Sequence, residues 1–201
     1  MPYTQHTAID SFHWLNNDVS NHNEFIRLWD SPRESFDVIN STSEGVSMWK
    51  IKESPFIFTI ALLSTIDQRV LYYIKCEIWE HINLGKPVTQ LKLWRTTHPK
   101  YQNITAGLPS KVFNVLLATY NVVASDGVHT YSGKRFWQQE LSRAIYKGLF
   151  VYRLDLTTRE LKQLLDIDKI ADNSVDLWGS DEKYMQILGV ISKNSLTDNK
   201  M

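Results

Sequence analysis

A block of strand-forming segments followed by alternating helices and strands is the feature that most constrains the fold. Between residues 46 and 96 the chain is rich in β-branched and aromatic residues, which predicts four strands, at residues 46–51, 56–63, 70–80 and 88–96. The turn-forming pairs Ser54-Pro55 and Asp67-Gln68 and the segment 84–87 separate them. After His98 the pattern alternates between helix and strand, so we expect a mixed α/β fold.

The second half of the chain supplies the remaining predicted elements. Apolar spacing predicts helices at 108–120 and 133–147, strands at 121–124 and 150–156, and a short helix at 158–165, while 184–192 is compatible with either a strand or a helix. Residues 1–45 are polar, with one helix predicted around 21–29, and we expect a frayed tail from Asn194. We therefore expect a single domain over residues 1–201.

Composition excludes several classes of protein. Lys plus Arg and Asp plus Glu both number 22, so net charge does not favour nucleic acid or an anionic membrane surface. One cysteine, Cys76, which we expect to be a packed thiol, forms no internal disulfide and suits a reducing, cytoplasmic compartment. No apolar run is long enough to span a membrane, and the six histidines lack the spacing of zinc enzymes.

The segment from His98 to Lys111, between a predicted strand and a predicted helix, carries the strongest functional signal. It resembles the acyl-CoA pyrophosphate loop of the GNAT superfamily of N-acetyltransferases, with Gln102, Thr105 and Gly107 at its three defining positions. In such a loop, backbone N–H groups near a helix N-terminus converge on phosphate oxygens. The resemblance implies acetyl-CoA binding by the backbone of the following residues: Gln102, Asn103, Ile104, Thr105, Ala106 and Gly107.

This loop departs from the family at two points. Thr105 stands where glycine is usual, and a β-branched residue is poorly suited to positive φ. Pro109, in the first helical turn, lacks an N–H to donate. The alternative is an ordinary turn into a helix, capped by Gly107 or Ser110.

The sequence Ala144 to Phe150 resembles the end of a later GNAT helix, whose tyrosine protonates the departing thiolate of coenzyme A. In that resemblance Tyr146 is the general acid, and Gln139 falls about where the family often has asparagine. Helical geometry places Trp137, Leu141 and Ala144 on one stripe and Tyr146 roughly opposite it. Tyr146 therefore faces either a cofactor groove or solvent.

The polar run from Ser125 to Thr130 follows a predicted strand, at the kind of position where open α/β sheets bind ligands. Asp126 and His129 are catalytic candidates there, and the run resembles segments of phage-encoded and mobile-element GNAT-like proteins. The alternative is an Asp-Gly turn followed by a helix capped by Ser132. Glu77 and Glu80 are the other candidates for a base, although each is compatible with a solvated surface position.

The GNAT resemblance covers about residues 46–156 and implies a central mixed, mostly antiparallel sheet flanked by helices. It further implies an acetyl-CoA-dependent N-acetyltransferase, whose amine acceptor is a small molecule or a protein. The alternative is a catalytically inactive GNAT-like protein of phage or mobile-element origin that binds a host protein. Nucleic-acid binding would rest only on scattered basic residues such as Lys134, Arg135 and Arg143.

Overall fold

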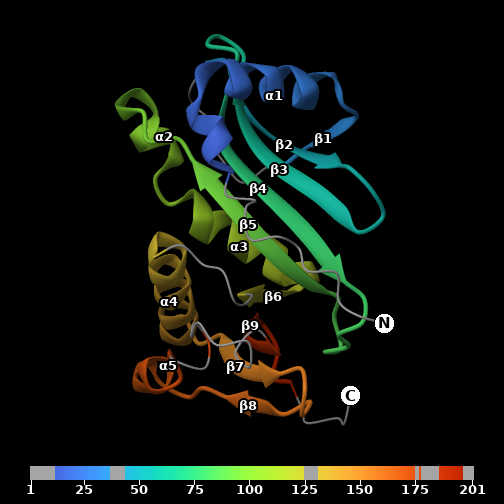
Figure 1. Cartoon of the computed structure of the whole chain (residues 1–201), viewed down its shortest axis with the longest axis vertical. Helices are drawn as coiled ribbons and strands as arrows, with labels where there is room; N and C mark the ends of the chain where they lie inside the picture. Colours follow the sequence, from blue (N-terminus) through green and yellow to red (C-terminus); the bar gives the residue numbers. More distant parts are fainter. Residues whose placement is uncertain (1–11, 37–43, 125–130, 175–176, 178–185, 197–201) are drawn as a thin grey trace. The chain divides into compact units, whose positions relative to one another are not determined.

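The computed structural model describes residues 12–36, 44–124, 131–174, 177 and 186–196. Helices and strands alternate in the second half of this chain, as the sequence predicts (Figure 1). The elements are, in order, η1 (Phe12–Asn16), α1 (Asp18–Asp30), β1 (Arg33–Ser35), β2 (Val46–Lys52), β3 (Ile57–Ser64), β4 (Arg69–Trp79), β5 (Val88–Arg95), η2 (Pro99–Tyr101), α2 (Gln102–Thr105), α3 (Leu108–Thr119), β6 (Asn121–Ala124), α4 (Tyr131–Tyr146), β7 (Phe150–Asp155), β8 (Leu161–Gln163), α5 (Ile167–Asp172) and β9 (Ile187–Ser192).

The strands hydrogen-bond in the order β1-β2-β3-β4-β5-β6-β9-β7-β8, which makes a nine-stranded sheet. β1 with β2, β2 with β3, β6 with β9, β9 with β7, and β7 with β8 are antiparallel pairs. β5 and β6 are parallel, with Val88, Thr89 and Gln90 opposite Asn121, Val122 and Val123. The expected class, α/β with a mixed, mostly antiparallel sheet flanked by helices, is confirmed.

The chain divides into two compact units, each described here by itself. The first comprises residues 1–75 and 92–108, and the second comprises residues 76–91 and 109–201. β4 and β5 each contribute residues to both units.

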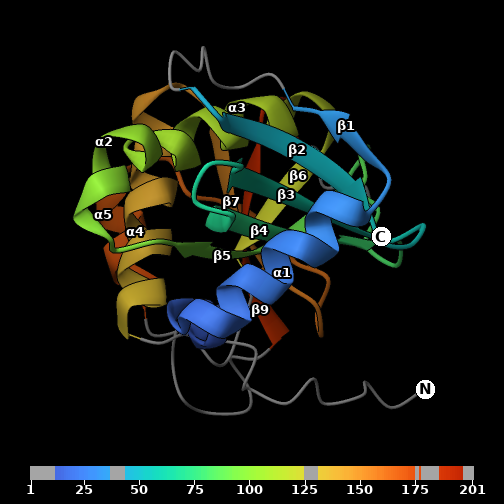
Figure 2. The ribbon, with the colours of Figure 1, turned by 90° about the horizontal axis from the view of Figure 1, so that it is seen from above.

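In the first unit, α1 lies across the sheet (Figure 2). It packs there through a narrow apolar stripe. Asn17 caps this helix, because its side-chain oxygen accepts the N–H of Ser20 at 3.0 Å. Phe25 and Leu28 are buried in a cluster with residues of β2, β3 and β4. Burying a side chain of this size contributes roughly 1.5 to 3 kcal/mol, so the stripe accounts for the position of α1.

In the second unit, α3 and α4 each bury an apolar stripe, and that of α4 is the one its sequence predicts. Val112, Phe113, Leu116 and Leu117 of α3 are buried, as are Trp137, Leu141 and Ala144 of α4. The rings of Phe113 and Trp137 meet edge to face with centroids 5.7 Å apart. A second cluster lies around β6, β7 and β9 and includes Val123, Tyr152, Leu188 and Val190.

Most predicted boundaries agree with the structure to within a few residues, but the predicted helix at 158–165 is wrong. Residues 161–163 form the strand β8, which pairs with β7, and the N–H of Leu164 donates to the carbonyl of Val151 at 2.8 Å. The spacing of the leucines suits a helix. Hydrogen bonding to the backbone N–H and C=O groups of β7 stabilises a strand here instead. The open alternative at 184–192 is settled as a strand, β9.

Several local expectations are corrected or confirmed. Both faces of β4 are covered, since Leu71 and Tyr73 are buried on one face and Tyr72 and Ile74 on the other. Cys76 is buried, as expected. Ser132 falls within the bounds of α4, Tyr131–Tyr146. None of the helices in the described ranges is long and apolar enough to cross a bilayer.

Candidate functional site

The segment between β5 and α3 is mostly helical. His98 begins it, since its side chain accepts the N–H of Lys100 at 3.2 Å, and Pro99–Tyr101 form a 3-10 turn. Gln102, Asn103, Ile104 and Thr105 form the one-turn helix α2, and Ala106 and Gly107 lead into α3. The loop that the sequence predicts as a phosphate cradle is therefore a compact double turn.

Two of the candidate backbone donors bond within the protein. The N–H of Gln102 donates to the carbonyl of Pro99. The N–H of Ala106 donates to the carbonyl of Gln102 at 2.9 Å. Any contribution of these two amides to an anion would require a shared or exchanged hydrogen bond.

Thr105 and Gly107 have different structural roles in the loop: Thr105 makes a buried side-chain hydrogen bond, and Gly107 adopts the positive φ. Thr105 is buried, and its hydroxyl donates to the carbonyl of Tyr101 at 3.1 Å. Gly107 has the positive φ, 71°, and no heavy atom lies within 4 Å of the position that a Cβ would take there. The strain expected for a threonine in place of glycine thus does not arise, because Thr105 has no positive φ.

An ion pair ties this segment to the turn between β3 and β4 in the same unit. Lys100 Nζ lies 2.7 Å and 2.8 Å from the two carboxylate oxygens of Asp67, and the Ser64 hydroxyl lies 3.1 Å from the second of them. Hydrogen bonds from Lys100 and from the Tyr101 hydroxyl lower the pKa of Asp67 to about 2. The pKa of Lys100 is raised, mainly by its hydrogen bond to Asp67.

Tyr146 ends α4 in the second unit, and its side chain is 88% exposed. The stripe opposite it is buried, so the predicted orientation of Tyr146 away from the core is confirmed. Gln139 is exposed on the same helix. The loop at 98–107 belongs to the first unit and Tyr146 to the second.

Sequence reasoning missed a buried carboxylate on α4. Glu140 is 5% exposed and pairs with Arg143, one turn further along the helix. Both line a cavity of about 20 Å³ with Ser110, Asn114 and Lys147, a volume sufficient for about one water molecule. The position of Glu140, three residues after Trp137 on the apolar stripe, is the sequence signal that identifies it.

The other candidates for acid-base chemistry are only partly described. Asp126 and His129 lie outside the described residues. Glu77 is half-buried on β4, where its backbone carbonyl accepts the Thr89 hydroxyl at 3.2 Å, and Glu80 is exposed. Among the described residues, no group of three or more His, Cys, Asp or Glu side chains is arranged to hold a metal ion.

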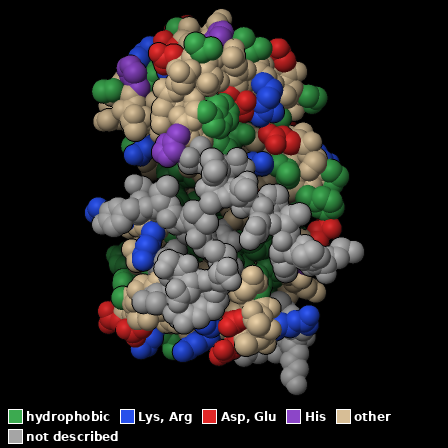
Figure 3. Space-filling model, viewed as in Figure 1, with side chains coloured by type: hydrophobic (Ala, Val, Ile, Leu, Met, Phe, Trp, Pro, Cys, Tyr) green, Lys and Arg blue, Asp and Glu red, His purple; other side chains and the backbone are tan. Residues whose placement is uncertain are grey.

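Charges of both signs are interspersed over the coloured part of the face shown in Figure 3. On this face, Lys and Arg side chains alternate with Asp and Glu, and neither sign gathers into a patch among the residues drawn in colour.

Comparison with known proteins adds no relative, since no protein-family model, curated protein or solved structure matches the chain.

Proposed function

We propose that this chain is an acetyl-CoA-dependent N-acetyltransferase of the GNAT type, acting on an amine in a small molecule or a protein. The observation that carries the proposal is the path from β5 through the compact turn and α3 to β6. Because β6 is parallel to β5, the segment 98–107 follows the carboxyl end of a parallel strand, where α/β sheets bind ligands. A cytoplasmic, reducing location suits both the thioester and the buried thiol of Cys76.

The conformation of Gly107 supports a ligand role for this segment. The residue has a φ of 71° and open space on the side that a Cβ would occupy, which permits a ligand to approach the backbone closely. It directly precedes the first residue of α3, a twelve-residue helix whose dipole favours an anion at this end. Acetyl-CoA would supply the diphosphate and the activated acyl group.

The chemistry asked of the side chains is proton transfer. The amine nitrogen bonds to the thioester carbonyl carbon, the carbon–sulfur bond breaks, the amine loses a proton and the thiolate gains one. Tyr146 is the proposed donor to the thiolate, and its exposed hydroxyl is accessible to a ligand. Asp126 and His129 are the proposed acceptors of the amine proton.

A second candidate is a non-catalytic protein of the same topology that binds a host protein. The internal hydrogen bonds of Gln102 and Ala106 favour it, because these amides are then structural. The 88% exposure of Tyr146 also favours it, since an exposed hydroxyl is solvated rather than held in a cofactor groove.

Thermal unfolding with acetyl-CoA separates the two candidates. A ligand at 100 times its Kd stabilises the folded state by about 2.7 kcal/mol, which raises Tm by roughly 5 to 11 °C for a chain of this size. Gly107→Ala should abolish much of this shift, because alanine is strained at this φ and its methyl group enters the open space. Gly85→Ala is the matched control, since Gly85 has a φ of 77° and equally open surroundings in the other unit.

The outcomes are distinct. A shift that Gly107→Ala removes and Gly85→Ala retains supports the proposed site, whereas no shift with wild type rejects acetyl-CoA binding. Turnover with peptide and small-amine acceptors then tests catalysis. Tyr146→Phe should lower kcat by about a hundredfold if Tyr146 is the acid, and an unchanged kcat would remove it from the mechanism.

A further inference from the structure

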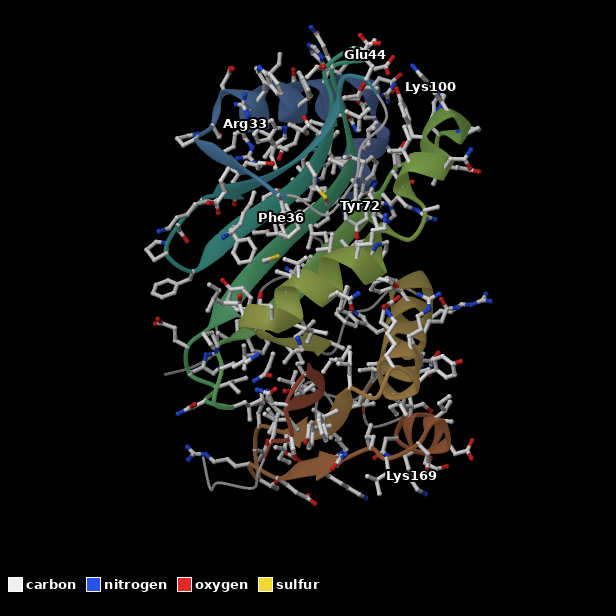
Figure 4. All side chains as sticks on the ribbon, turned by 180° about the vertical axis from the view of Figure 1, so that it is seen from behind. Arg33, Phe36, Glu44, Tyr72, Lys100 and Lys169 are labelled. Carbon is white, nitrogen blue, oxygen red and sulfur yellow. The ribbon has the colours of Figure 1, made fainter. Side chains whose placement is uncertain are left out.

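The turn between β3 and β4 holds the segment 98–107 through side chains that no sequence motif identifies. Lys100 leads into α2, and its ammonium group reaches both carboxylate oxygens of Asp67 at 2.7 Å and 2.8 Å. Figure 4 shows Lys100 projecting from this segment beside the ribbon. The two residues are 33 positions apart in sequence, so the pair fixes a long-range contact.

Asp67 is itself held in place by its own turn. Its N–H donates to the Ser64 hydroxyl at 3.2 Å, and that hydroxyl lies 3.1 Å from the second carboxylate oxygen. The Asp67 side chain is 27% exposed, against 56% for Lys100. Asp67 is therefore the less exposed member of the pair, and its carboxylate also bonds within its own turn.

The restraint continues into the body of the loop through Tyr101. Tyr101 is buried, and the Lys100 ammonium lies 5.3 Å from the centre of its ring. The carbonyl of Tyr101 accepts the hydroxyl of buried Thr105 at 3.1 Å. Asp67 is thus linked by consecutive contacts to the residue two positions before Gly107.

We propose that Asp67 is a positioning residue for the segment 98–107, holding it through Lys100 and Tyr101 in the conformation that binds the diphosphate of coenzyme A. This inference rests on the proposed function for its ligand. Asp67 itself touches no substrate; it acts through the other two side chains.

The test compares Asp67→Asn, Lys100→Gln and Lys100→Arg with wild type. Two quantities are measured: amide hydrogen exchange of peptides covering residues 98–108, and the Kd for coenzyme A by calorimetry. Asp67→Asn and Lys100→Gln should each speed exchange and weaken binding by about two- to fivefold, and Lys100→Arg should retain both because arginine also bonds both oxygens. Asp172→Asn is the matched control, since Asp172 pairs with Lys169 at 3.0 Å in the other unit.

Each outcome decides a separate claim. Unchanged exchange of residues 98–108 in Asp67→Asn, with the variant folded by circular dichroism, overturns the positioning role even if wild type binds coenzyme A. Faster exchange with an unchanged Kd shows that Asp67 is only structural and also overturns it. If wild type binds no coenzyme A, the proposed function and the ligand named here both fail, while the exchange data still decide the anchoring.

Discussion

Asn21 in α1 and Val70 in β4 are joined by two hydrogen bonds through one side chain. The Asn21 side-chain oxygen accepts the N–H of Val70 at 2.9 Å, and its amide nitrogen donates to the Val70 carbonyl at 3.1 Å. The same nitrogen donates to the carbonyl of Leu15 at 2.9 Å. Asn21 is 1% exposed, so one amide bridges the helix, the preceding turn and the sheet.

Asn21→Ala should therefore destabilise the protein by about 3 kcal/mol or more. The substitution leaves a backbone N–H and two carbonyls without their partner in the interior, and each such group costs roughly 1 to 3 kcal/mol. Urea unfolding measures the change. Asn23→Ala, at an exposed position two residues along the same helix, should change the free energy of unfolding by less than about 0.5 kcal/mol, and equal losses in the two variants would contradict the assignment.

The Asp67–Lys100 pair should make stability depend on pH in acid. The folded-state pKa of Asp67 is about 2, below the value of about 3.9 in an unfolded chain. The pair thus contributes stability that is fully present above about pH 4 and is lost as pH falls through about 2. The stability difference between wild type and Asp67→Asn, measured by urea unfolding, should shrink over this window, and a constant difference would argue against the ion pair as its source.

Arg33 should hold the edge strand β1 in place. Its guanidinium carbon lies 4.1 Å from the centre of the Trp29 ring and 4.9 Å from that of Trp49, and the side chain also donates to the Trp29 carbonyl. Arg33→Ala should cost about 1 to 2 kcal/mol and speed amide exchange in β1. Arg33→Lys should retain part of the effect, and exposed Arg95 provides a control for loss of a positive charge alone.

A side chain at Gly189 should require the Leu141 side chain to shift. A Cβ added at Gly189 would lie 3.1 Å from Cδ1 of Leu141 and 3.5 Å from Cβ of Ala124. Gly189→Ala should therefore destabilise the protein by about 1 to 2 kcal/mol through overpacking. In Gly189→Ala with Leu141→Val the two losses should be less than additive, and simple additivity in thermal unfolding would show that Leu141 is not the obstacle.

Much of the secondary structure follows from local pattern. Most strands from β2 to β7 and the helices α3 and α4 carry regular spacing of apolar residues, because each buries at least one face over much of its length. The segment 161–163 does not, since its three residues become a strand only when β7 offers an unpaired edge. β1 likewise depends on its partner β2 and on the two tryptophans that hold Arg33.

In the candidate site, too, some features follow from local sequence and others depend on contacts between distant parts of the chain. The glycine before α3 and the orientation of Tyr146 follow from sequence, because a positive φ and a helical stripe are local properties. The link from Asp67 to Lys100 does not, since the two residues are separated by all of β4 and β5.

By itself the sequence determined most of the longer strands and helices and the buried stripe of α4, since period and turn chemistry are written into consecutive residues. Only the tertiary structure decided which distant group satisfies a buried polar side chain, as the backbone of Val70 in β4 does for Asn21 in α1. The physical reason is that burying a polar group is favourable only where a partner from elsewhere in the chain compensates its lost hydration, and only the fold brings that partner within reach.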